Sequence, residues 1–94
     1  MQTTAKNPKV YVAVQVAFRE DGVMLPREIT WEDGVKYEID RVSEIRQAPA
    51  MKAGGQGDRY TVWIGNKRSY LFFERSGNLT GNNIGRWFVE RRSA

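Results

Sequence analysis

Basic and aromatic residues alternate along residues 59–74 in a pattern that suits nucleic-acid binding. In an extended chain every second side chain points to the same face. One face of this segment then carries Arg59, Thr61, Trp63, Arg68, Tyr70, Phe72 and Glu74. Nucleobases stack on aromatic rings at roughly 1 to 3 kcal/mol each, and guanidinium groups bind phosphates. The segment therefore predicts a surface for single-stranded nucleic acid, or for a protein that processes it.

The same residues also fit a second interpretation. The opposite face of the segment is apolar, with Tyr60, Val62, Ile64, Leu71 and Phe73, and must form part of the core. Large side chains on both faces are also expected where a loop, the N-terminal arm or a second copy covers the outer face. A self-associating module, with its aromatic face buried in a homodimer, is therefore the alternative function.

Two lysines add positive charge near this surface. Lys67 lies at the turn of the segment, and Lys52 precedes a glycine-rich stretch within residues 48–58. Backbone amides in such a stretch can cradle phosphate, but the spacing is not that of a P-loop and no helix follows. We expect a flexible loop there, with Lys52 supplying charge beside the aromatic face.

The composition excludes several kinds of chemistry. The chain has no cysteine and no histidine, which rules out disulfides, thiolate metal sites and Ser-His or Cys-His catalytic pairs. The predicted pairing sets Glu28 opposite Glu38, but on an open sheet beside Lys36, so we expect a solvated charged face. The sequence predicts a non-enzymatic binding module with no catalytic residue, metal or cofactor.

Alternating apolar residues predict the strands that position these side chains. Residues 10–18 place Val10, Val12, Val14, Val16 and Phe18 on one buried face. In residues 29–42, a three-residue loop at 32–34 pairs Trp31 with Val35 and Ile29 with Tyr37. Val42 and Ile45 are both expected to be buried, and because their spacing breaks strict alternation, a bulge is expected between them.

The segment that carries the basic and aromatic residues is predicted to be a second hairpin. A turn at residues 66–67, or a four-residue loop between Ile64 and Ser69, pairs Trp63 with Tyr70, Val62 with Leu71 and Tyr60 with Phe73. A polar loop at 76–85 and a short strand at 86–92 complete the chain. Five or six such strands predict an all-β antiparallel meander that curls into a small SH3-like or OB-like barrel.

Domain organisation and charge follow from the same reading. We expect a flexible arm at residues 1–9, one β-barrel domain at 10–92 and a tail at 93–94. Residues 1–47 carry a net charge of −1 and residues 48–94 one of +5, so an anionic partner is expected at the second half. The N-terminus lacks an apolar signal segment, and no apolar run approaches the roughly 18 residues of a membrane span. The sequence thus predicts a cytoplasmic protein without a membrane partner.

Two segments resemble a known family. They are "ITWEDGVKYEIDRVSEIRQA" and "GRWFVERR". Together they are similar to a small all-β domain of unknown function found in short Gram-positive bacterial proteins and beside translesion DNA polymerase-like proteins. There too, a Trp-loop-Tyr hairpin precedes an Arg-Val strand, and the chain closes on a Gly-Arg-Trp segment. The resemblance covers residues 10–92 and implies a bacterial protein in a nucleic-acid context, without implying any catalytic residue.

Overall fold

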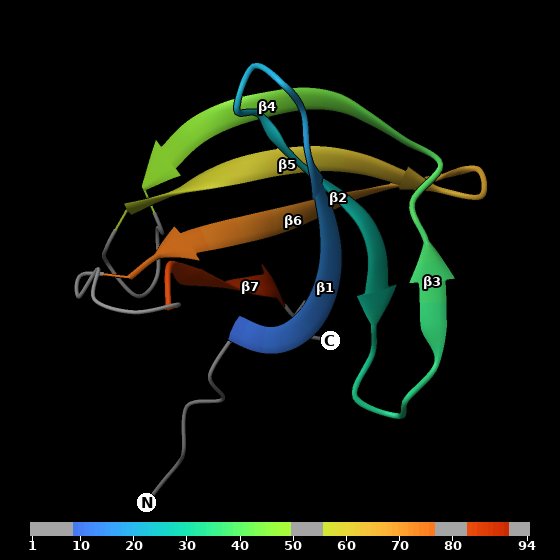
Figure 1. Ribbon diagram of the computed structural model, residues 1–94. Helices are drawn as coiled ribbons and strands as arrows, with labels where there is room; N and C mark the ends of the chain where they lie inside the picture. Colours follow the sequence, from blue (N-terminus) through green and yellow to red (C-terminus); the bar gives the residue numbers. More distant parts are fainter. Residues whose placement is uncertain (1–8, 50–55, 77–82, 91–94) are drawn as a thin grey trace, which may run out of the picture.

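The computed structural model describes residues 9–49, 56–76 and 83–90, which form one curled antiparallel sheet (Figure 1). Its strands are β1 (Lys9–Phe18), β2 (Met24–Thr30), β3 (Lys36–Glu38), β4 (Arg41–Pro49), β5 (Gln56–Ile64), β6 (Lys67–Arg75) and β7 (Gly85–Glu90). The sheet curls through 246° and stays open as a half-barrel. The prediction of an all-β, curled antiparallel sheet is confirmed, whereas the predicted number of five or six strands is wrong, and the curled sheet does not close into a barrel.

The strand order explains how the sheet curls without closing. It runs β3-β2-β1-β7-β6-β5-β4, so β1 joins β2 to the C-terminal strand β7, and β3 and β4 form the two edges. Residues 39 and 40, which connect β3 to β4, link the two sides of the curl at one point by hydrogen bonds to β2 and β5. The Ile39 amide donates to the Arg27 carbonyl at 2.9 Å, and the Asp40 amide donates to the Trp63 carbonyl at 2.8 Å. Beyond this point β2 and β4 separate, because no hydrogen-bonded strand lies between them in the described part of the chain.

The first predicted hairpin is confirmed in its register. The Trp31 amide donates to the Val35 carbonyl at 2.8 Å, which closes the three-residue loop, and Ile29 pairs with Tyr37. Gly34 has a φ of 86°, a left-handed conformation that glycine adopts without a steric penalty. Glu28 pairs with Glu38, as the sequence predicted.

The second hairpin has a different register from the predicted one. Its strands meet at a two-residue Gly65-Asn66 turn, so Trp63 pairs with Arg68, Val62 with Ser69, Thr61 with Tyr70 and Tyr60 with Leu71. Gly65 has a φ of 61°, and its amide donates to Asp40 Oδ2 at 2.7 Å. This bond to a residue outside the hairpin supports the tight turn. The pairing has moved by two residues, and because the period of a strand is two, each side chain keeps its predicted face.

The concave face of the sheet holds the core. Its buried residues are Ile29, Ile39, Tyr60, Val62, Leu71, Phe73 and Trp87, with valines of β1 packed against them. The predicted apolar face of β5 and β6 is thus confirmed, with Ile64 partly buried beside it. The Tyr60 hydroxyl donates to the Met24 carbonyl at 3.0 Å. This bond links β5 to β2 from opposite sides of the open curl.

The bulge predicted in β4 is confirmed, but one burial prediction beside it is wrong. The β4–β5 register shifts between Val42 and Glu44, which leaves Ser43 as the extra residue. Val42 packs against the core, whereas 41% of Ile45 is exposed. Ile45 pairs with the buried Tyr60 and so belongs to the concave face. Ile45 is exposed because β4 is an edge strand, and no further strand among the described residues pairs with its free edge.

Several predicted boundaries are shifted or lie outside the described residues. Residues 48–49 and 56–58, predicted as loop, belong to β4 and β5. Residues 1–8, which hold most of the predicted arm, and residues 50–55, which include Lys52, lie outside the described residues. So do residues 77–82 of the predicted polar loop and 91–94 at the C-terminus. In the part of the chain described here, no helix is long and apolar enough to cross a membrane.

Candidate functional site

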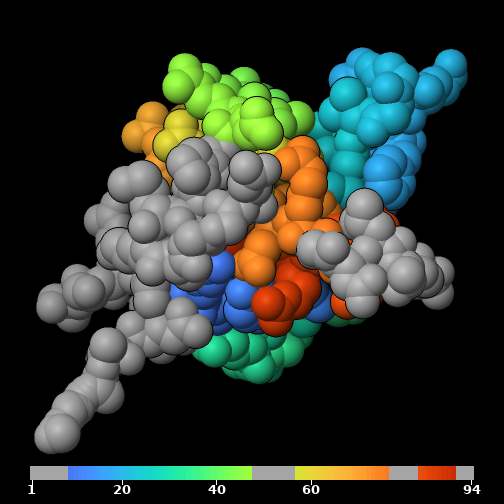
Figure 2. All heavy atoms as spheres, turned by 90° about the vertical axis from the view of Figure 1, so that its left-hand side faces the viewer, coloured from blue at the N-terminus to red at the C-terminus, as the bar shows by residue number. Residues whose placement is uncertain are grey.

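The convex face of the sheet carries cross-strand rows of aromatic and basic side chains. One row places Arg41 of β4 beside Trp63 of β5 and Arg68 of β6. The next places Thr61 beside Tyr70. A third runs from Arg59 through Phe72 and Phe88 to Tyr11. Figure 2 shows orange, red and blue atoms of β6, β7 and β1 next to one another at the end of the sheet that faces the viewer. Adjacent pairing of antiparallel strands thus brings residues from the two ends of the chain onto one surface.

Five residues at the β4–β5–β6 end form a ring–arginine cluster: Arg41, Arg59, Trp63, Arg68 and Tyr70. The Arg41 Cζ lies 4.7 Å from the centroid of the Trp63 ring. The Cζ atoms of Arg59 and Arg68 lie 4.7 Å and 5.9 Å from the centroid of the Tyr70 ring. The Trp63 indole is also held by its Nε1, which donates to the Ser43 hydroxyl at 3.1 Å. The cluster is therefore arranged by contacts within the folded chain.

Within the described residues, none of Arg41, Arg59 and Arg68 forms an ion pair with a carboxylate. Glu44 lies opposite Thr61 on the same face as the cluster but is paired with Arg46. The Nε of Arg59 is buried and has no hydrogen-bond partner. Three guanidinium groups whose charge is not compensated, set against aromatic rings, favour an anionic ligand that also offers a flat surface for stacking.

The other end of the convex face is built around Glu74, which pairs with two basic side chains. Lys9 Nζ lies 2.9 Å from Glu74 Oε1, and the Tyr11 hydroxyl donates to the same oxygen at 2.8 Å. Arg86 Nη2 lies 3.6 Å from Glu74 Oε2 and donates to the Tyr11 hydroxyl at 3.2 Å. The hydrogen bond from Lys9 is the main cause that holds the pKa of Glu74 below its usual value. This Glu74 network joins β1, β6 and β7 and carries a net charge of +1, with both cations held by the carboxylate.

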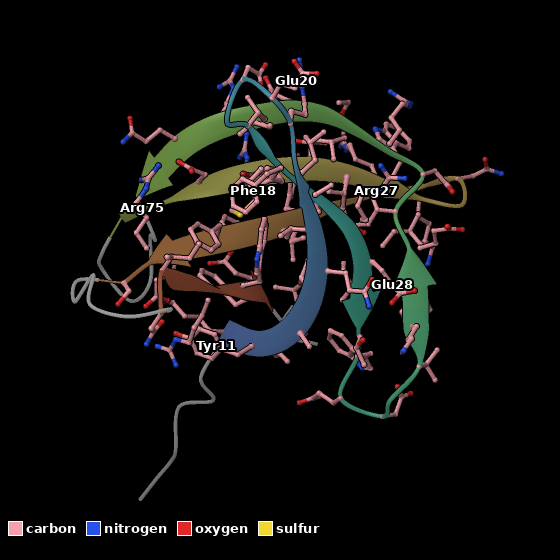
Figure 3. The ribbon with its side chains drawn as sticks, in the orientation of Figure 1. Tyr11, Phe18, Glu20, Arg27, Glu28 and Arg75 are labelled. Carbon is pink, nitrogen blue, oxygen red and sulfur yellow. The ribbon has the colours of Figure 1, made fainter. Side chains whose placement is uncertain are left out.

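The Phe72 side chain mainly packs against neighbouring side chains of the convex face. Its ring stacks on the Phe88 ring with centroids 5.1 Å apart and an angle of 7° between the planes. Tyr11 meets Phe88 edge-on at 5.8 Å, and Lys9 Nζ lies 4.7 Å from the Phe88 ring centroid. Phe88 is only 1% exposed although it belongs to the convex face. Side chains of the chain itself therefore cover this part of the aromatic face (Figure 3, where Tyr11 is labelled).

The structure brings together four of the seven site residues predicted from the sequence: Arg59, Trp63, Arg68 and Tyr70. Phe72 shares their face but packs on Phe88. Lys67 pairs with Ile64 on the opposite face, where both line a separate pocket of about 280 Å³ with Trp31, Tyr37 and Ser69. Lys52 lies outside the described residues. Lys67, predicted to add charge near the aromatic face, therefore lies on the opposite face of β6 from Arg68, because side chains alternate along a strand.

Arg41 was not predicted to belong to the site. Its position depends on the pairing of β4 with β5, which sets Arg41 beside Trp63. The nearest sequence signal was the predicted bulge after Val42, because the extra residue Ser43 is what allows β4 to present Arg41 and Ser43 to the same indole. The positions of Arg41 and Trp63 in the sequence do not show that they are neighbours, and only the strand order does.

The side chains of this surface are suited to bind a ligand by stacking and by ionic contacts. Among the residues that the structure describes, no group of three or more carboxylates lies close enough together to hold a metal ion. Comparisons of the chain with protein-family models, with curated proteins and with solved structures give no match. The resemblance to the polymerase-associated domain accordingly stays an interpretation of the sequence, and any function for this chain has to be argued from its own residues.

Proposed function

We propose that this protein is a non-catalytic module that binds single-stranded nucleic acid through the ring–arginine cluster. The observation that carries the proposal is the combination of three arginines, none ion-paired within the described residues, with the rings of Trp63 and Tyr70. Single strands expose both a phosphate backbone and unstacked bases, and so match both parts of the cluster.

Each side chain has a distinct part in this proposal. The arginines bind phosphates, since a guanidinium stacked on a ring still directs N–H groups outward from its edge. Tyr70 is 42% exposed, so it offers ring surface on which a base can stack. Trp63 is fixed by Arg41 and Ser43, which lowers the entropy lost when a ligand binds. The proposal requires no base-specific hydrogen bond and predicts weak sequence preference.

The alternative, a homodimer that buries the aromatic face, is less well supported. A two-fold contact through this face would bring the same uncompensated guanidinium groups of both copies together. Like charges in a desolvated contact are unfavourable. The most apolar rings of the face, Phe72 and Phe88, are already covered by each other and by Tyr11 and Lys9.

The proposal is tested by fluorescence anisotropy with a labelled oligothymidylate of about 15 nucleotides, the upper range of a small β-barrel site. Affinity should fall as salt rises, with a log–log slope of about −0.7 for each phosphate contact, hence about −2 for three arginines. The triple variant Arg41→Gln, Arg59→Gln and Arg68→Gln should lose most of this slope, and Tyr70→Leu should weaken binding about tenfold with the slope unchanged.

A matched control removes the same net charge elsewhere. Arg19 and Arg75 each form an ion pair with a carboxylate, and Lys67 lies on the opposite face of β6, so the triple variant with Gln at these three positions should keep most of the affinity. Equal losses in the two triple variants would show a general charge effect and contradict the proposal. Binding that is absent at low salt in the wild type would also contradict it. Light scattering that shows a dimer, disrupted by Tyr70→Glu, would instead support the alternative.

A further inference from the structure

The open side of the half-barrel contains a pocket between two strands that do not pair. β2 and β4 separate beyond Ile39 and Asp40, and a pocket of about 490 Å³ lies between them, lined by both strands and by the β1–β2 hairpin. In Figure 2 the tip of this hairpin (light blue) and β4 (green) project separately at the top of the molecule. A curl of 246° leaves about a third of the circumference of a barrel unfilled. The gap is therefore part of the architecture of the sheet.

Apolar side chains line this gap. Ile45 of β4 lines the pocket and is 41% exposed. Leu25 of β2 and Val42 of β4 line the same pocket. Ile45 would be covered in a closed barrel. Together these side chains form an apolar strip that an additional strand would bury.

The edge of β4 offers backbone groups to such a strand. In the described residues β4 pairs only with β5, so its other edge has no partner strand. The part of β4 that can pair with another strand is limited at one end by the bulge at Ser43. At the other end it is limited by Pro49, which has no amide hydrogen to donate. This leaves residues 44–48, where an extended segment can add by main-chain hydrogen bonds.

A second copy of the chain does not fit this edge. Antiparallel pairing of β4 with β4 of another copy needs a two-fold axis normal to the sheet, which turns both concave faces the same way. Two sheets that each curl through 246° would then enter the same space. The gap therefore suits a single extended segment rather than the edge of another half-barrel.

The charges that line the gap indicate what this segment carries. Arg27 and Arg41 line the pocket, and neither forms an ion pair among the described residues. Of the carboxylates beside them, Glu44 pairs with Arg46 at 2.8 Å, whereas Asp40 accepts only the neutral Gly65 amide and keeps its charge, so Arg27, Arg41 and Asp40 together leave a net charge of +1. Arg27 is labelled beside the gap in Figure 3. The uncompensated charge is positive and favours an acidic partner.

We propose that an extended acidic segment of a partner protein adds to β4 as a further strand. Its apolar side chains cover Ile45 and the apolar strip beside it on the concave side, and the alternate carboxylates meet Arg27 and Arg41. This strand addition uses the edge of β4, whereas nucleic-acid binding is proposed for the convex face, mainly on β5 and β6. Arg41 is common to both surfaces, so the test also relies on residues that the ring–arginine cluster lacks.

The test uses two synthetic peptides of about seven residues, a common strand length, in which valine alternates with glutamate or with lysine. Binding is followed by amide chemical shifts and hydrogen exchange in the ¹⁵N-labelled protein. The glutamate peptide should bind, shift the amides of residues 44–48 and slow their exchange. The lysine peptide should bind at least about tenfold more weakly. Shifts centred elsewhere, or no binding by the glutamate peptide, would overturn the proposal.

Two variants separate apolar from ionic recognition. Ile45→Gln should weaken the glutamate peptide about tenfold, whereas Val35→Gln, at a residue 44% exposed on the other hairpin, should have no effect. The double variant Arg27→Glu and Arg41→Glu should reverse the preference and bind the lysine peptide more tightly. An unchanged preference in the double variant would reject the assigned charges. Ile45 is an exposed edge residue, and circular dichroism checks that each variant is folded.

Discussion

The guanidinium carbon of Arg59 lies 4.7 Å from the centroid of the Tyr70 ring, while the Nε of the same arginine is buried without a hydrogen-bond partner. A buried polar group without a partner costs stability, on the order of 1 to 3 kcal/mol. Arg59 therefore combines favourable stacking on Tyr70 with an unfavourable buried nitrogen. Such a combination is expected where a charged group serves binding rather than folding.

Replacement of Arg59 by methionine should separate these two effects. The variant keeps an apolar stem over Tyr70 and removes the unpartnered nitrogen, so the free energy of unfolding should stay unchanged or rise by up to about 1 kcal/mol. Oligonucleotide affinity should fall, and the salt slope should decrease by about 0.7. Urea unfolding and anisotropy titrations measure the two quantities. A variant that loses stability but keeps its affinity would show that Arg59 is a structural residue.

Glu74→Gln should change the acid stability of the protein. The folded state lowers the pKa of Glu74, so the ionised carboxylate contributes stability above the usual glutamate pKa of about 4.3, and this is lost as pH falls through the lowered value. At neutral pH the variant should be about 1 kcal/mol less stable than the wild type, and the difference should shrink in acid. Glu90→Gln, an exposed change at the end of β7, is the control. A difference that is constant with pH would contradict this assignment.

Tyr60→Phe should destabilise the open curl. The hydroxyl donates to the Met24 carbonyl, and its removal leaves that oxygen without this donor, at a cost of about 1 to 2 kcal/mol. Burial is the main cause that raises the pKa of Tyr60, so the protonated phenol favours the fold, and this contribution is lost as pH rises through the raised value. Urea unfolding of Tyr60→Phe beside the exposed Tyr37→Phe, together with alkaline tyrosinate absorbance, checks both statements.

Gly57→Ala should weaken the pairing of β5 with β6. A Cβ atom at Gly57 would collide with the backbone carbonyl of Phe73, so the two strands would have to separate there. Gly57 pairs with Glu74, and the Glu74 network would be disturbed as well. We expect a loss of about 2 kcal/mol or more, measured by thermal or urea unfolding against Ser69→Ala, an exposed change on β6. Equal stability of the two variants would show that the strands adapt without cost.

Local patterns in the sequence predicted much of the fold. Strict alternation determined which side of each strand is buried, because side chains of a strand point alternately to its two faces. The Glu32-Asp33-Gly34 loop also determined the first hairpin register, since Gly34 adopts the left-handed conformation that this turn needs. These features depend on neighbouring residues, and so they are visible in one chain without knowledge of its tertiary contacts.

Tertiary structure decided the features that depend on distant residues. The Gly65-Asn66 turn is supported by Asp40, and the second hairpin has a register that differs from the predicted one by two residues. The pairing of β4 with β5 brought Arg41 to Trp63. The open edge exposed Ile45. The sequence by itself determined the face of each strand, whereas strand order and closure were decided only in three dimensions, because they depend on backbone pairing between segments whose patterns look alike.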